Sequence, residues 1–165
     1  MIKDYFCIQV RQSVQLALPL ENVIDVITLN WEKIYPIPGV AAALLGVVNQ
    51  RGRLLWVLEL GDLLSQLLGL TPSPIRYRVG ERLKLLTITL NPVEQMPSED
   101  SRQIACVVSE LKGVVSLDTD NIKPIPTNLT PSFNSFLSGV AVIKNLPVAL
   151  LNVPAIFATL RILTP

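Results

Sequence analysis

Few side chains in this sequence have the types and the spacing that catalysis needs. The 165 residues include no histidine, which removes the commonest general base and the Ser-His and Cys-His nucleophile pairs. The two cysteines, Cys7 and Cys106, lie far apart in apolar runs, a pattern typical of buried small hydrophobes in a reducing compartment. We therefore expect no disulfide and no transition-metal site.

The acidic residues are also poorly placed for acid–base chemistry. The densest cluster, Glu94, Glu99 and Asp100, surrounds a proline in a polar stretch, where a solvated turn is a simpler interpretation than a catalytic pair. Asp118 and Asp120 follow an apolar run, as turn residues do. No glycine-rich loop has phosphate-binding spacing. The sequence predicts no enzyme and no bound cofactor. An enzyme stays an alternative only if its site uses backbone groups and carboxylates alone.

The composition indicates a globular chain without a strong electrostatic field. Half of the residues are apolar, which is enough to fill the core of one ordinary domain or two small ones. The formal charge is +1, from 14 basic and 13 acidic residues, so nothing draws the whole molecule to nucleic acid or anionic lipid. The first residues lack a secretory signal pattern, and the longest apolar run, Gly39 to Val48, is far shorter than the roughly 20 residues of a membrane helix. We expect a cytoplasmic protein with no direct membrane insertion.

The stretch from Gly46 to Gly69 carries the clearest structural signals. Two apolar runs flank the polar tetrapeptide from Asn49 to Gly52, whose glycine suits a tight reversal, so the pattern predicts a β-hairpin. Leucines then recur at helical spacing, which predicts a helix that covers the second strand and ends at Gly69. Arg51 stands at the tip beside Asn49, which we expect to order the turn. Arginine is favoured at interface hot spots, so we interpret Arg51 as a partner contact.

The larger aromatic residues divide between core and surface. Trp56 lies in the apolar second run of the hairpin, so we interpret it as a core residue. Trp31 and Tyr35 lie in a polar loop ahead of two prolines. They are the better candidates for exposed anchors.

The sequence contains a second, diverged copy of one unit. With an offset of 88 residues (124 − 36), Pro36-Ile37-Pro38 falls on Pro124-Ile125-Pro126. With an offset of 93 residues (139 − 46), the hairpin that begins at Gly46 falls on a run that begins at Gly139. Each copy closes with a strand and a helix start, marked by Glu59 and by an N-cap at Asn152. These matches in one order predict an internal duplication.

The duplication suggests two small barrels. Each copy holds about five short strands, too few for a sandwich, so a closed or nearly closed barrel is the economical way to protect strand edges. We expect a first barrel over residues 4–69, a linker over 70–82 and a second barrel over 83–160, with a groove between the barrels that suits a partner's helix. The linker carries Arg76, Arg78 and Arg82 near Tyr77. A nucleic-acid-binding module of tandem small β-barrels is therefore the alternative, although the near-neutral charge speaks against it.

The run from Gly46 to Gly52, followed by Leu58-Glu59-Leu60, resembles the signature of the CheW-like coupling domain family, in which Gly-Val, then Asn-x-Arg-Gly, then Val-Asp-Leu recur. The opening hairpin, the approach from Pro36 to Gly39 and the end from Gly139 to Asn152 follow in the family's order. The resemblance therefore covers the chain, 1–165, as a single domain. It implies a mainly β fold of two five-stranded SH3-like barrels with short helices, in agreement with the duplication.

The resemblance also implies a function, that of a non-catalytic adaptor. Such adaptors link the cytoplasmic tip of a methyl-accepting chemoreceptor to the regulatory domain of a CheA-like histidine kinase, and neither a cofactor nor nucleic acid is expected. The family's receptor-binding positions fall here on Leu20, Val23, Asp25, Gly46, Asn49 and Arg51. Its kinase contacts fall near Ile37, Gly39, Val40 and Ala42. The chain departs from the family pattern at Gln50, Trp56, Glu59 and Ser109. Which receptor, kinase and output it serves stays open, and pilus motility or light-directed movement is as admissible as swimming chemotaxis.

Overall fold

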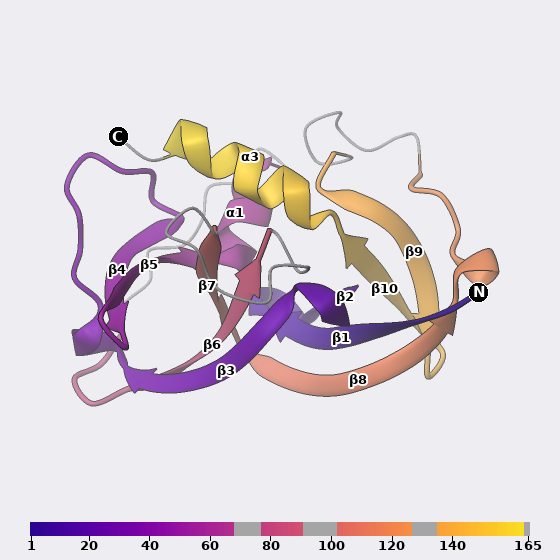
Figure 1. Cartoon of the computed structure of the whole chain (residues 1–165), viewed down its shortest axis with the longest axis horizontal. Coiled ribbons are helices and arrows are strands. Elements are labelled where there is room, and N and C mark those ends of the chain that lie inside the picture. Colours follow the sequence, from indigo (N-terminus) through magenta and orange to yellow (C-terminus); the bar gives the residue numbers. More distant parts are fainter. Residues whose placement is uncertain (68–76, 91–101, 127–134, 164–165) are drawn as a thin grey trace.

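Two five-stranded sheets form the body of the molecule, and each curls around its own half of the structure (Figure 1). The computed structural model describes residues 1–67, 77–90, 102–126 and 135–163. Sheet A has the strand order β8 (Glu110–Asp118), β1 (Ile2–Val10), β2 (Val14–Pro19), β10 (Leu146–Leu151) and β9 (Leu137–Ile143). Sheet B has the order β3 (Val23–Asn30), β6 (Arg82–Thr89), β7 (Gln103–Val108), β5 (Arg53–Glu59) and β4 (Leu44–Gln50). This architecture confirms the predicted mainly β fold of two SH3-like five-stranded units.

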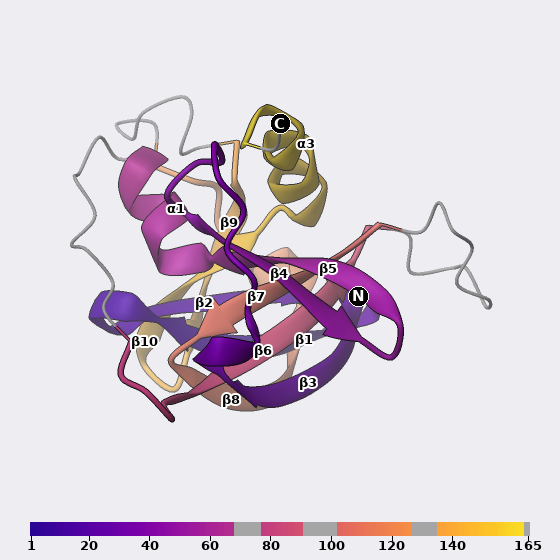
Figure 2. The ribbon, with the colours of Figure 1, turned by 90° about the vertical axis from the view of Figure 1, so that its left-hand side faces the viewer.

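Two helices lie together on one side of the sheets (Figure 2). Helix α1 (Leu60–Leu67) follows β5, and helix α3 (Val153–Leu163) follows β10, as the leucine spacing and the two helix starts predicted. The Oδ1 atom of Asn152 accepts the N–H of Ala155 at 3.3 Å, which confirms the predicted N-cap. Among the described residues, 3₁₀ turns connect strands at η1 (Arg11–Ser13), η2 (Leu20–Asn22), η3 (Trp31–Lys33) and η4 (Thr119–Asn121).

The predicted duplication is visible in the pairing of the strands. An isolated bridge joins Tyr35 to Val47 in sheet B, and a second joins Lys123 to Val140 in sheet A. The positions differ by 88 (123 − 35) and 93 (140 − 47), the two offsets found in the sequence. The sheets also share one order of equivalent strands, since β3, β6, β7, β5 and β4 correspond to β8, β1, β2, β10 and β9. The two copies therefore fold alike.

The predicted barrel boundaries, 4–69 and 83–160, do not match the sheets. Strands β1 and β2 come from the first half of the chain but complete sheet A, whose other three strands come from the second half; β6 and β7 complete sheet B in return. The halves thus exchange their leading hairpins. Comparison of the sequence with itself cannot detect this exchange, because equivalent strands have the same apolar pattern whichever sheet they join. Most of the predicted linker, 70–82, lies outside the described residues.

Three clusters of packed apolar side chains stabilise the two sheets and the contact between them. One fills the inside of each curled sheet, and the largest lies between them and includes side chains of both sheets and both helices. The central strand β7 serves two of the clusters, because Ile104 and Cys106 pack between the sheets while Ala105 and Val107 pack inside sheet B. Side chains of a strand alternate between its two faces. Because both faces of β7 are buried, its sequence is a continuous apolar run.

Candidate functional site

The β4–β5 turn presents Arg51 to solvent. Arg51 and Gly52 have φ values of 53° and 80°, as a two-residue hairpin turn with two left-handed residues requires. The Oδ1 atom of Asn49 accepts the N–H of Gly52 at 2.9 Å, so Asn49 orders the turn as predicted. The guanidinium of Arg51 extends from a fixed backbone at the tip of an exposed hairpin.

Gly46, by contrast, has a structural reason to be glycine. Its φ is 143°, and a Cβ at this position would lie 2.1 Å from the carbonyl oxygen of Tyr35. The backbone of β4 therefore approaches the loop before it too closely for any side chain. Gly46 is buried, so any partner contact at this position involves its neighbours.

Strand β3 turns Val23 and Asp25 toward the protein and Ile24 and Val26 toward solvent. The burial alternates along the strand, and Ile24 and Val26 are 44% and 40% exposed. Val23 packs at the rim of the cluster between the sheets, next to Leu20 in the half-buried η2 turn that precedes it. The sequence pattern alone did not determine whether Val23 and Asp25 face the protein or the solvent. In the structure they face the protein.

Asp25 is a half-buried acid with an unusual environment. Its Oδ1 atom is buried without a hydrogen-bond partner among the described residues, and the same holds for Oγ1 of Thr87, its neighbour on β6. The register places Asp25, Thr87, Ala105, Val57 and Gly46 in one row across sheet B. The predicted receptor-binding residues thus gather at one end of sheet B, on its two edge strands.

The predicted kinase-contact residues lie together in the loop between η3 and β4. Gly39 and Ala42 are exposed, whereas Ile37 and Val40 are half-buried and Val40 packs against the cluster between the sheets. The nearby Tyr35 is 62% exposed, as expected of an anchor.

The prediction that Trp31 is an exposed anchor is wrong. Trp31 is half-buried, and it packs against the cluster inside sheet B. Its ring centroid lies 6.1 Å from that of Tyr77. The two aromatic rings therefore cover one end of the sheet B core.

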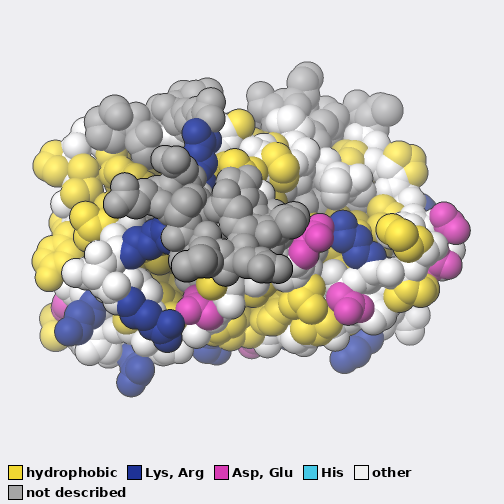
Figure 3. All heavy atoms as spheres, viewed as in Figure 1, with side chains coloured by type: hydrophobic (Ala, Val, Ile, Leu, Met, Phe, Trp, Pro, Cys, Tyr) yellow, Lys and Arg dark blue, Asp and Glu magenta, His cyan; other side chains and the backbone are white. Residues whose placement is uncertain are grey.

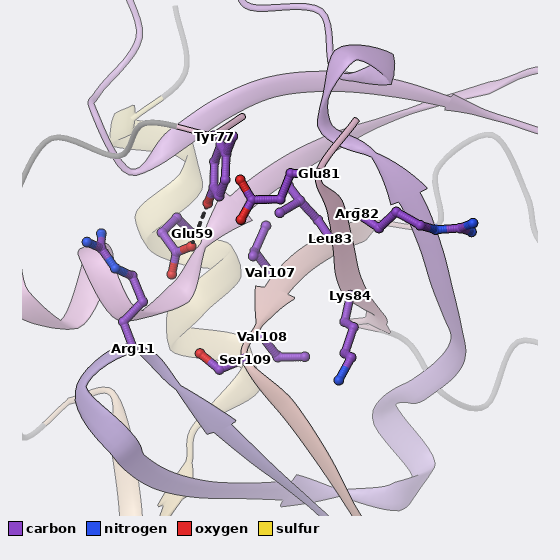
Figure 4. Close-up of a pocket in the computed structure, with 10 residues that line it drawn as sticks. All are labelled: Arg11, Glu59, Tyr77, Glu81, Arg82, Leu83, Lys84, Val107, Val108 and Ser109. Carbon is purple, nitrogen blue, oxygen red and sulfur yellow. Dashed lines mark hydrogen bonds between the residues drawn. The ribbon is translucent and has the colours of Figure 1, made fainter. Parts of the chain in front are cut away.

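A cleft of about 540 Å³ opens at the junction of the two sheets (Figure 4). Strands β6 and β7 of sheet B supply half of its lining, and Arg11 and Ser109 close it from the side of sheet A. Glu59 and Tyr77 point toward each other in the cleft, whereas Arg82 and Lys84 point away from them. The predicted groove between the barrels thus has a counterpart here, but none of the predicted receptor or kinase residues lines it.

Glu59 is the buried acid of this cleft, a residue only 2% exposed. Its Oε1 atom accepts the N–H of Gly61 at 3.1 Å, and its Oε2 atom accepts the hydroxyl of Tyr77 at 3.2 Å. Burial, and after it the charge of Asp62, raises the pKa of Glu59 to about 7, although both hydrogen bonds and the charge of Arg11 oppose the rise. Glu59 can therefore gain and lose a proton near neutral pH.

An ion pair beside Glu59 ties the two sheets together. Arg11, in the β1–β2 connection of sheet A, donates from Nη1 to Oδ1 of Asp62 at the start of α1. Burial raises the pKa of Asp62, although Arg11 opposes the rise. A Cβ at Gly61 would lie 3.1 Å from Cβ of Arg11, so the first turn of α1 and the η1 turn are in close contact. Sequence reasoning placed Glu59 at a helix start but missed its burial, although an acid enclosed by leucines was the available signal.

The described residues offer little for covalent or metal chemistry. Cys7 and Cys106 are buried free thiols, as predicted, and burial raises the pKa of both, which suppresses the reactive thiolate. Within the described ranges, no group of three or more His, Cys, Asp or Glu side chains could hold a metal ion. The cluster of Glu94, Glu99 and Asp100 lies outside them.

The basic and aromatic cluster does not form a stacking platform. The ring of Tyr77 packs beside Trp31, and its hydroxyl is engaged by Glu59. Arg78 and Arg82 are exposed, and Arg76 lies outside the described residues. In the part of the chain that the structure describes, no helix is long and apolar enough to cross a membrane.

The face of the molecule seen in Figure 3 carries basic, acidic and apolar side chains side by side, without a large area of one charge. Such a mixed surface agrees with the near-neutral charge of the chain. A nucleic-acid interface needs a continuous basic footprint, and this face does not provide one.

Comparisons with known proteins agree with this geometry. A solved structure, the crystal structure of the scaffolding protein TtCheW from Thermoanaerobacter tengcongensis, superposes with a TM-score of 0.68 at 17% identity, covering 92% of this chain and 90% of that one. The comparison with curated proteins finds no significant match. The family model of the CheW-like domain matches residues 4–161. The duplicated two-sheet fold, the ordered Asn49–Gly52 turn and this match together establish that the chain belongs to the CheW-like domain family.

Proposed function

We propose that this chain is a non-catalytic adaptor of chemotaxis-type signalling, which couples chemoreceptor-type proteins to a CheA-like histidine kinase. The observation that carries the proposal is the family match over residues 4–161. The similar solved structure belongs to a protein described as a scaffolding protein, which supports the same role. The scarcity of catalytic groups among the described residues fits an adaptor, because an adaptor needs only surfaces.

The receptor surface in this proposal is the end of sheet B that carries the predicted residues. Arg51 offers an exposed guanidinium on a turn whose backbone is already ordered, so little backbone conformational entropy is lost when a partner binds. Val23 offers a half-buried apolar surface at the rim of the core between the sheets. A helical receptor tip with apolar and acidic side chains fits this pairing.

The kinase surface in this proposal is the loop that contains Ile37, Gly39, Val40 and Ala42. Two of these residues are half-buried and two exposed, so the loop is anchored to the core yet accessible. Kinase and receptor then contact different elements of the chain, which lets one adaptor hold both.

The experiment that tests the receptor surface uses the duplication as its control. Lys144 occupies the same turn position in the β9–β10 hairpin as Arg51 does in β4–β5, with φ of 51° against 53°. We expect micromolar binding of a soluble chemoreceptor tip fragment, measured by isothermal titration calorimetry. Arg51→Ala weakens it by about tenfold, as loss of a moderate hot spot does, whereas Lys144→Ala leaves it unchanged.

A second pair of variants tests the apolar part. Val23→Asp is expected to weaken receptor binding, and Leu111→Asp, at the equivalent position of β8 (111 − 23 = 88), is expected to leave it near the parent value. Circular dichroism and thermal unfolding verify that each variant is folded. Equal binding by Arg51→Ala, Val23→Asp and the parent would show that the receptor surface is misplaced.

The proposed kinase surface and the signalling pathway are tested by separate measurements. Ala42→Asp is expected to reduce binding to the isolated kinase regulatory domain without changing receptor binding. The output proposed is a motility response, with pilus motility and phototaxis as the specific candidates. Identification of the receptor and kinase genes beside this one distinguishes them from swimming.

A further inference from the structure

The two edge strands of sheet A face a second cleft. Strands β8 and β9 stand at opposite edges of the sheet, and they come close at the same end of the molecule (Figure 1). A cleft of about 540 Å³ is lined by Ser116 to Asp118 of β8, by Val140 to Val142 of β9 and by the connection through Lys123. Pockets of this size hold small ligands or short peptide segments.

The β9 side of the cleft offers backbone groups to a partner. In the β9–β10 hairpin, Ile143 pairs with Leu146 across the two-residue turn, so Val140 and Val142 fall at the pairs whose backbone groups point away from β10. Val140 exchanges both of its backbone bonds with Lys123, at 2.9 Å each. Val142 is the next outward position, and it forms a non-hydrogen-bonded pair with Pro147 of β10.

The β8 side of the cleft is arranged in the same way. The N–H of Thr119 donates to the carbonyl of Met1 at 2.9 Å, which fixes the alternation of bonded pairs along β1 and β8. Counted from this bond, Ser116 and Asp118 turn their backbone groups away from β1 and toward the cleft. Outward backbone groups on strand edges are templates for an added strand.

The side chains of the cleft indicate what such a strand contains. Leu117, Ile122 and Ala141 belong to the apolar cluster inside sheet A or pack against it, and Val142 is 63% exposed beside them. Asp120 and Lys123 bring charges of opposite sign to the rim, and the carboxylate of Asp118 is paired with the N-terminal ammonium of Met1. The lining therefore favours apolar side chains facing inward and polar side chains at this mixed rim.

The two sheets differ in side-chain size at the position next to this cleft. Trp31 packs against the core of sheet B, and the corresponding residue in sheet A is Thr119 (119 − 31 = 88). Thr119 has no ring to cover the corresponding part of the sheet A core, which agrees with an open cleft next to it.

We propose that the cleft between β8 and β9 binds an extended peptide segment of a partner protein, with alternating apolar and polar residues, as an added strand along the edge of β9. The N–H and C=O of Val142 provide the backbone bonds, and the floor around Leu117 receives the apolar side chains. This site is separate from the proposed receptor surface on sheet B and from the proposed kinase surface in the loop between η3 and β4.

The probe for this proposal is an acetylated and amidated hexapeptide of alternating valine and lysine. Titration of the ¹⁵N-labelled protein, followed by NMR, is expected to shift the amides of Ser116, Asp118 and Val142 saturably. A peptide in which serine replaces valine serves as the control for charge alone. Equal binding of the serine peptide, or shifts confined to other regions, would overturn the proposal.

Two variants separate the backbone contribution from the side chain. Val142→Pro removes the outward N–H, which takes no part in the bonds to β10, and edge positions of this kind tolerate proline. We expect it to lower the affinity for the valine peptide by about tenfold. Val142→Thr retains the N–H and the branched shape, and it is expected to bind within about twofold of the parent. If the Pro variant binds as tightly as the Thr variant, strand addition at β9 is refuted.

Discussion

Substitution of Glu59 by glutamine should make the stability of this protein less dependent on pH. The Glu59 carboxyl is buried between the hydroxyl of Tyr77 and the N–H of Gly61, and its pKa is raised from 4.5 to about 7. The folded protein therefore binds this proton more tightly than the unfolded chain does. The resulting stability is fully present below about pH 4.5 and is lost as the pH rises through about 7.

The size of the effect follows from the shift in pKa. A rise from 4.5 to about 7 corresponds to about 3 kcal/mol of unfolding free energy, most of which is lost between about pH 4.5 and pH 7. A glutamine amide at this position would have no charge to bury and could keep an oxygen toward Gly61. Asp62 contributes in the same direction, since burial raises its pKa too, but it is present in both proteins and cancels from the comparison.

Urea unfolding followed by tryptophan fluorescence, at constant ionic strength across that pH range, measures the effect. The parent should lose stability as the pH rises from about 4.5 to about 7, and Glu59→Gln should lose about 2 to 3 kcal/mol less over the same range. Glu81→Gln is the matched control, because Glu81 lines the same cleft but is exposed. If Glu59→Gln keeps the full slope of the parent, burial does not govern the protonation of Glu59.

Three further predictions concern the fold. Gly46→Ala should lower the unfolding free energy by about 2 kcal/mol or more, because its Cβ would clash with the carbonyl of Tyr35, whereas Gly52→Ala, with open space around it, should cost only about 1 kcal/mol for its positive φ; chemical denaturation compares them. Asn152→Ala should cost about 1 kcal/mol by the same assay, since it removes the N-cap of α3. The Cys106 thiol should resist iodoacetamide in the folded protein and react only at the rate of unfolding, as mass spectrometry of the modified peptide can determine, because it is buried.

Much of the local structure was predictable because local patterns determine it. The turn at Asn49 to Gly52 needs two residues with left-handed backbone and a side chain that accepts a backbone N–H. These requirements concern only the four residues of the turn itself. The N-cap at Asn152 is equally local. Self-comparison of the sequence also reveals the duplication, since the offsets of 88 and 93 reappear in the two bridges.

The exchange of hairpins between the sheets could not be predicted in the same way. Ile104 to Val108 are all buried, and such a run indicates burial on both faces without naming the strand beside it. The parallel pairing of β7 with β5, and of β2 with β10, depends on long-range packing that either half could satisfy. The burial of Glu59 escaped prediction for a related reason, because the cleft that encloses it is assembled from both sheets.

The value of a duplicated scaffold lies in the differences between equivalent positions. The turn that carries Arg51 in sheet B carries Lys144 in sheet A, with nearly the same backbone. The helix start that holds the buried acid Glu59 in one copy holds the capping amide Asn152 in the other. Geometry is thus kept between the sheets while charge and shape diverge, so two similar surfaces can select two different partners. Each variant in one sheet consequently has a control variant at the equivalent position of the other sheet. If both variants of such a pair weakened the binding of one partner equally, the idea that the two sheets select different partners would be contradicted.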